Sequence, residues 1–178
     1  MTYLFVLLAL SLAASSLGWL YFIYFFSIGY GFAISVLSMA ILVIFREVMT
    51  WPSALFCLLM FVYGIRLGLF LWLRERLSSS YKKILYQPAN TTKKPFWVML
   101  MIWVSCALLY VGQMSPVTFY LSNQCAGLNV SEGWMWAGAV IATLGVLTEV
   151  VADAQKSAAK RNNAHRFVDT GLYRFVRC

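Results

Sequence analysis

The amino-acid sequence predicts an all-α integral membrane protein, a bundle of about five transmembrane helices, from three observations. Of its 178 residues, 62% are hydrophobic and 11% charged, whereas soluble domains are about 45–50% apolar and about 25% charged. No charged side chain occurs before Arg46, and the basic residues gather in two later segments. A soluble globule and a disordered chain are therefore excluded. A disulfide scaffold is excluded as well, because the four cysteines form no CxxC pair.

The uncharged N-terminal stretch is long enough for two spans. A hydrocarbon core about 30 Å thick requires roughly 20 apolar helical residues, and residues 2–45 exceed twice that number. We place the break at the glycine-containing segment 27–31. The sequence therefore predicts spans near 3–26 and 30–46.

Three further spans follow in the same way. A third is predicted near 53–73, entered through Trp51-Pro52, because proline is favoured in the first turn of a helix. A fourth is predicted over 96–114, where Ser115-Pro116 ends or kinks the helix. A fifth is predicted over 133–152. All five belong to one transmembrane domain, residues 1–178.

The basic segments predict the orientation. Residues 74–95 contain six Lys/Arg against one acid, and residues 152–178 contain six against two. By the positive-inside rule, loop 74–95 and the C-terminal tail are cytoplasmic, and five spans then place the N-terminus outside. A bacterial inner membrane or the endoplasmic reticulum would suit this topology. Attraction to anionic lipid accounts for the charge, so no nucleic-acid partner is expected.

Polar side chains within the third span are the first functional candidates, because ionisable groups inside a membrane cost a few kcal/mol each. Tyr63 and Arg66 are three residues apart and share a helical face. One interpretation is an arginine that extends its head towards the interface while its stem covers apolar surface. The other is a polar site inside the bundle that is open to the cytoplasm.

The end of the fifth span is the second candidate. Glu149, Asp153, Lys156 and Lys160 recur at i, i+4, i+7 and i+11, which places them on one helical stripe. Acid–lysine pairs on a solvated helix end are one explanation. Nucleotide binding is the other, because carboxylates accept hydrogen bonds from ribose or amide groups and Lys/Arg bind phosphate oxygens. No metal site is expected, since His165 is the only histidine.

Two motifs resemble one family. Tyr63-Gly-Ile-Arg-Leu continuing to Arg74, with Ser80-Tyr-Lys-Lys after it, resembles the "W-G-x-R-L…R" segment of steroid 5-alpha-reductase-like membrane proteins, a group that includes DUF1295. Glu149-Val-Val-Ala-Asp-Ala-Gln-Lys, followed by Thr170-Gly-Leu-Tyr-Arg-Phe-Val-Arg, is similar to the group's "E-x-x-A-D-x-Q-K … T-G-L-W-x-x-x-R" signature. The chain ends at Cys178, where members of the group continue with "(H)PNY…GE", so a truncated member is expected.

The resemblance implies an oxidoreductase that uses NADPH to reduce a carbon–carbon double bond conjugated to a ketone. Its expected partners are a steroid or related lipid substrate and the surrounding membrane lipids. Tyr63 matches a tyrosine that sits at the substrate ketone in the steroid reductases, and we assign it as catalytic. The residues assigned to the cofactor, with 153–178 as the cytoplasmic cofactor-binding segment, are Glu149, Asp153, Lys160, Arg166 and Tyr173.

Two other function classes stay open. A membrane methyltransferase of the isoprenylcysteine or phospholipid type would bind S-adenosylmethionine instead. A non-enzymatic protein that binds lipid is the third possibility. The basic cluster favours NADPH, because its pyrophosphate and 2′-phosphate are negatively charged and S-adenosylmethionine has no phosphate.

Overall fold

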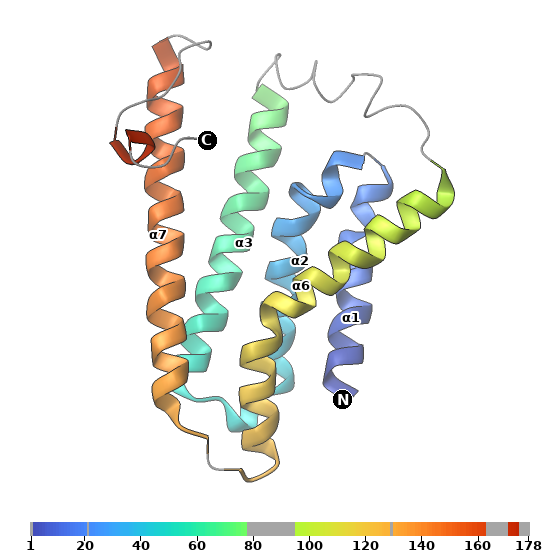
Figure 1. Ribbon diagram of the computed structural model, residues 1–178, viewed down its shortest axis with the longest axis vertical. Coiled ribbons are helices and arrows are strands. Elements are labelled where there is room, and N and C mark those ends of the chain that lie inside the picture. Colours follow the sequence, from blue (N-terminus) through green and yellow to red (C-terminus); the bar gives the residue numbers. More distant parts are fainter. Residues whose placement is uncertain (1, 21, 78–94, 129, 163–170, 175–178) are drawn as a thin grey trace. The chain divides into compact units, whose positions relative to one another are not determined.

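The computed structural model describes residues 2–20, 22–77, 95–128, 130–162 and 171–174. These residues form helices and turns with no strand among them, which confirms the all-helical fold class (Figure 1). The chain divides into two compact units, residues 1–136 and residues 137–178.

Three helices are long and apolar enough to cross a membrane, so the chain is a membrane protein. They are Trp51–Leu73 within α3, Phe96–Cys125 (α6) and Glu132–Ala159 within α7. The two N-terminal spans that the sequence predicts correspond to shorter apolar helices, Tyr3–Trp19 and Ile28–Ile44.

The first helix is interrupted earlier than the sequence predicts. Helix α1 is Thr2–Ser15, and the 3₁₀ turns η1 (Ser16–Trp19) and η2 (Phe22–Phe25) follow it. Helix α2 then runs over Ile28–Ile44, so the helical interruption lies before residue 28 and not at the predicted break at 27–31, and the helix expected over 3–26 is not continuous. A close contact between two residues lies within this interruption, at Gly18 of η1. The ring of the fully buried Phe25 lies where a Cβ of Gly18 would stand.

Helix α3 begins as the sequence predicts. It runs over Trp51–Leu77, with Pro52 in its first turn, after the short 3₁₀ turn η3 (Arg46–Val48). The backbone N–H of Thr50 donates to Ser53 Oγ at 3.0 Å, which is one half of a capping box. That hydrogen bond satisfies a backbone donor that the helix itself leaves without a partner.

Helix α6 passes through the proline that was expected to end or kink it. The helix spans Phe96–Cys125 and does not stop at residue 114. Pro116 has no N–H for the carbonyl of Gly112, but Ser115 Oγ donates to that carbonyl at 2.8 Å. Figure 1 shows α6 changing direction partway along its length, and the helix continues past the proline to Cys125.

Helix α7 (Glu132–Asn162) also continues beyond its predicted end near 152. The added turns contain three alanines, two lysines, a glutamine and an arginine, which are strong helix formers. The segment predicted as a separate tail from residue 153 therefore begins as the last turns of this helix.

Helix α2 is the centre of the first unit, because it packs against α1, α3 and α6 (Figure 1). Its contact with α3 is very close. A Cβ on Gly31 would stand 2.8 Å from Gly64 O, and a Cβ on Gly64 would stand 2.5 Å from Gly31 O. Ser35 Oγ donates across the same contact to Phe61 O at 3.2 Å. Small residues let the two backbones approach, and this contact positions the part of α3 that carries Tyr63.

Orientation is testable through the native cysteines. Cys125 is exposed at the end of α6, whereas Cys57 and Cys106 are buried; Cys178 lies outside the described residues. With an outside N-terminus, we expect a membrane-impermeant maleimide to label Cys125 in intact cells. Cys178 should react only after permeabilisation. Single-cysteine variants separate the two signals, and labelling of Cys178 from outside would overturn the predicted topology.

Candidate cofactor and substrate sites

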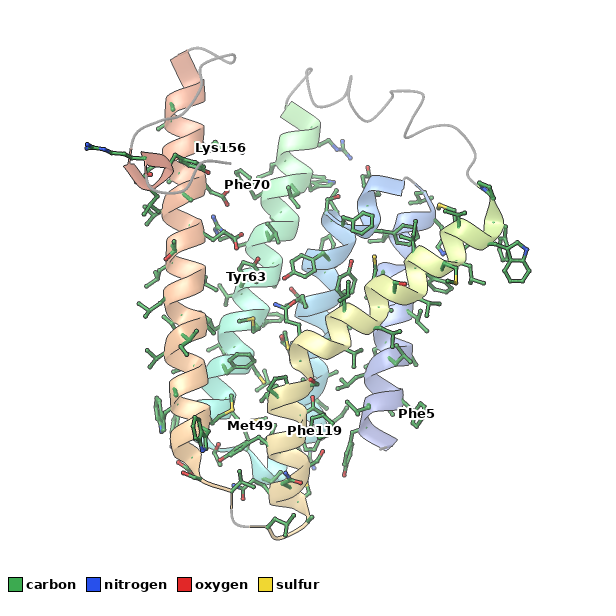
Figure 2. The ribbon with its side chains drawn as sticks, viewed as in Figure 1. Phe5, Met49, Tyr63, Phe70, Phe119 and Lys156 are labelled. Carbon is green, nitrogen blue, oxygen red and sulfur yellow. The ribbon has the colours of Figure 1, made fainter. Side chains whose placement is uncertain are left out.

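Tyr63 and Arg66 lie on α3 in the first unit. Both side chains are half-buried, and Nη1 of Arg66 is fully enclosed. Because the residues are three apart on a continuous helix, they share one face, as the sequence predicts. Phe70 extends this face by another turn towards the C-terminal end of α3 (Figure 2). The face thus combines a phenol, a cation and an aromatic ring.

The acidic pair lies on α7 in the second unit. Glu149 and Asp153 are half-buried, and Lys156 is exposed; Figure 2 shows Lys156 in the later part of the helix. Because α7 is unbroken to Asn162, the stripe predicted from spacing holds as far as Lys160. The backbone of Lys160 is helical, and its side chain lies outside the described residues.

Residues 171–174, from the second half of the signature, contact α7. The backbone N–H of Leu172 donates to Gln155 Oε1 at 2.9 Å. Gly171 has a φ of +67°, and a Cβ there would overlap the amide of Gln155. Glycine is favoured on both grounds, since it alone adopts positive φ at no steric cost and leaves room for the amide. Gln155 therefore joins the two halves of the signature.

This hydrogen bond holds the 3₁₀ turn η4 (Gly171–Arg174) beside α7. The turn carries Tyr173, which is half-buried, and Arg174, which is exposed. Arg166 falls outside the described residues. The structure thus brings the turn that carries Tyr173 to the helix that carries Glu149 and Asp153. Tyr63, the predicted catalytic residue, belongs to the first unit.

The polar side chains of the second unit are of the kinds that bind a nucleotide. Two carboxylates supply acceptors for hydroxyl or amide groups, and the exposed Lys156 and Arg174 supply cations for phosphate oxygens. In the part of the chain that the structure describes, no three His, Cys, Asp or Glu side chains are grouped as a metal would require.

Sequence reasoning missed three structural features. The signature contains Gln155, but the sequence alone assigns it no role. The spacing of Gly64 and Gly68, four residues apart in an apolar helix, could have indicated the close contact with α2. The third is an apolar groove, which forms from residues far apart in the sequence: Leu17, Tyr24, Ile28, Phe32, Leu69 and Trp72.

Comparison with known families gives one match. A family model described as "Protein of unknown function (DUF1295)" matches residues 25–178, which include both motifs. The resemblance to that family is confirmed. A search of curated proteins and a search of solved structures each gave no match.

Proposed function

Because the chain belongs to the DUF1295 family, we propose that it is a membrane-embedded, NADPH-dependent reductase of a conjugated carbon–carbon double bond in a steroid or related lipid enone. The family membership agrees with the steroid 5-alpha-reductase-like motifs on α3 and α7. The observation that carries the proposal is the hydrogen bond from Leu172 N–H to Gln155 Oε1. It holds the turn that carries Tyr173 and Arg174 beside the helix that carries Glu149, Asp153 and Lys156, which supports one common site.

In this proposal the residues of the second unit hold the cofactor. Glu149 and Asp153 accept hydrogen bonds from ribose hydroxyl or carboxamide groups, because ionised carboxylates are strong acceptors. Lys160 and Arg166 bind the phosphates, and Tyr173 lines the site from the η4 turn. When bound, NADPH supplies the hydride.

Tyr63 acts on the substrate. Addition of hydride to the β-carbon of an enone would shift the electron pair of the double bond, so that negative charge would develop on the ketone oxygen until a proton from water added to the α-carbon. The phenol of Tyr63 donates a hydrogen bond to that oxygen and stabilises the charge as it forms. A phenol suits an apolar pocket, because it donates without bringing a net charge into the membrane.

Cofactor discrimination tests the assignment of Lys160 and Arg166. If either side chain contacts the 2′-phosphate, replacing it by alanine should weaken NADPH binding more than NADH binding. Hydrogen bonds to charged groups contribute about 1.5–3 kcal/mol, or roughly 10- to 150-fold in affinity. Both affinities can be measured on the purified protein by nicotinamide fluorescence.

The matched control is Arg46→Ala, which removes an exposed arginine paired with Glu47 in the η3 turn. We expect it to leave both affinities unchanged. Equal loss of NADPH and NADH in the Lys160 and Arg166 variants would reject the 2′-phosphate role. If neither affinity changed, the basic residues would act only in setting the orientation of the chain in the membrane. Binding of S-adenosylmethionine in place of NADPH would indicate the methyltransferase alternative.

A further inference from the structure

An apolar groove opens on the first unit, between the 3₁₀ turns and helices α2 and α3. Its volume is about 350 Å³, which is near the lower end of the roughly 300–1,000 Å³ typical of ligand sites. Its walls are almost entirely hydrocarbon and aromatic. The residues that line it are Leu17, Tyr24, Ile28, Phe32, Leu69 and Trp72. A groove of this size and chemistry suits one hydrocarbon chain.

The groove lies on a different side of α3 from Tyr63. Trp72 follows Tyr63 by nine residues, and at about 100° per residue that separation turns it about 180° around the helix. Leu69 follows Tyr63 by six residues and is turned about 120° away. The groove is therefore separate from the face assigned to the substrate ketone, and a ligand in it does not depend on the proposed reaction.

A cation stands beside the groove. The guanidinium carbon of Arg76 lies 4.9 Å from the centre of the Trp72 ring, which is a cation–π distance. Arg76 is exposed and lies one turn beyond Trp72, towards the C-terminal end of α3. The guanidinium charge beside the groove is complementary to an anion.

We propose that the groove binds one acyl chain of an anionic phospholipid, whose phosphate headgroup contacts Arg76. The chain fills the apolar walls, and Trp72 occupies the level between chain and headgroup that tryptophan favours in membranes. Basic residues at the end of a transmembrane helix attract anionic headgroups. A zwitterionic lipid would fill the groove with its chain but would lack the net attraction to the cation.

Photo-crosslinking with matched lipids tests the site. The purified protein is incubated with phosphatidylglycerol or phosphatidylcholine carrying the same diazirine-labelled chain, and crosslinked peptides are mapped by mass spectrometry. We expect phosphatidylglycerol to label the groove residues of α2 and α3 several-fold more than phosphatidylcholine. Arg76→Gln should reduce that preference about fivefold, the effect of one cation near an anionic surface. Leu69→Trp should block labelling by both lipids.

Two matched variants complete the experiment. Arg46→Gln removes another exposed arginine, and Leu109→Trp adds the same bulk at a leucine of α6 that is 69% exposed; neither should change groove labelling. Equal labelling by the two lipids in the wild type would overturn the proposal, as would an unchanged preference in Arg76→Gln. Complete loss of groove labelling by both lipids in excess inorganic phosphate would also contradict it, because phosphate can compete for Arg76 but cannot fill the apolar walls. Arg76 is exposed, so its variant remains informative if Leu69→Trp fails to fold.

Discussion

Tyr63→Phe is expected to lower turnover of an enone substrate at least tenfold, while NADPH affinity and folding stay near normal. The substitution keeps the half-buried ring and removes only the hydroxyl. A donor aimed at charge that develops in the transition state has its main effect on rate, and losing one typically costs about 10²–10³. The measurement is the steady-state rate of NADPH oxidation with a steroid or lipid enone, alongside thermal unfolding of the same preparation.

Tyr120→Phe is the matched control for this prediction. Tyr120 is buried on α6, where its hydroxyl accepts from Thr50 Oγ1 at 3.5 Å and from Gln124 Nε2 at 3.3 Å. Removing that hydroxyl should cost about 1 kcal/mol of stability and leave turnover unchanged. If Tyr63→Phe behaved in the same way, Tyr63 would be a packing residue of the bundle and would leave the mechanism.

Gly64→Ala is expected to destabilise the protein by about 1–3 kcal/mol or more, the usual cost of overpacking a tight interior. The added Cβ would stand 2.5 Å from the backbone oxygen of Gly31 and would overlap Ser35 Oγ. A backbone oxygen cannot rotate away as a side chain can, so α2 and α3 would have to separate. Unfolding of the purified protein by heat or denaturant in detergent measures the loss.

Gly112→Ala provides the comparison for Gly64→Ala. A Cβ at Gly112 on α6 would have no heavy atom within 4 Å, so the same chemical change meets open space. Alanine is the better helix former by roughly 0.5–1 kcal/mol, and this variant should be equal to the wild type or slightly more stable. If both variants had the same unfolding midpoint, the close contact of α2 with α3 would not contribute to stability.

The membrane fold could be predicted because its signal is additive along the chain. Each apolar residue in the long stretches adds to the same transfer free energy, so α3, α6 and α7 are evident without any knowledge of their neighbours. The helical stripe on α7 could be predicted for a similar reason. That Glu149, Asp153 and Lys156 share one face depends only on the helical period, and the helix is unbroken over these residues.

The features that could not be predicted depend on contacts between distant residues. The interruption after Ser15 contains the contact of the Phe25 ring with Gly18, and local propensity does not report such packing. Where α6 continues through Pro116, a side-chain hydroxyl, Ser115 Oγ, satisfies the carbonyl that the proline leaves without a partner. The role of Gln155 needs the chain to return after the end of α7. In each case a tertiary or side-chain contact overrides the local pattern.

The short first helix has a consequence for the surrounding lipid. Helix α1 has 14 residues, so at 1.5 Å per residue it is about 21 Å long, less than the roughly 30 Å hydrocarbon thickness of a typical bilayer. Helices α3 and α6, with 27 and 30 residues, exceed that thickness. Where the predicted first span crosses the membrane through so short a helix, hydrophobic mismatch thins the bilayer around it at a cost of fractions of a kcal/mol per Å. We therefore expect lipids beside α1 to be compressed relative to those beside α6, which would favour a thin host membrane or lipids with short chains.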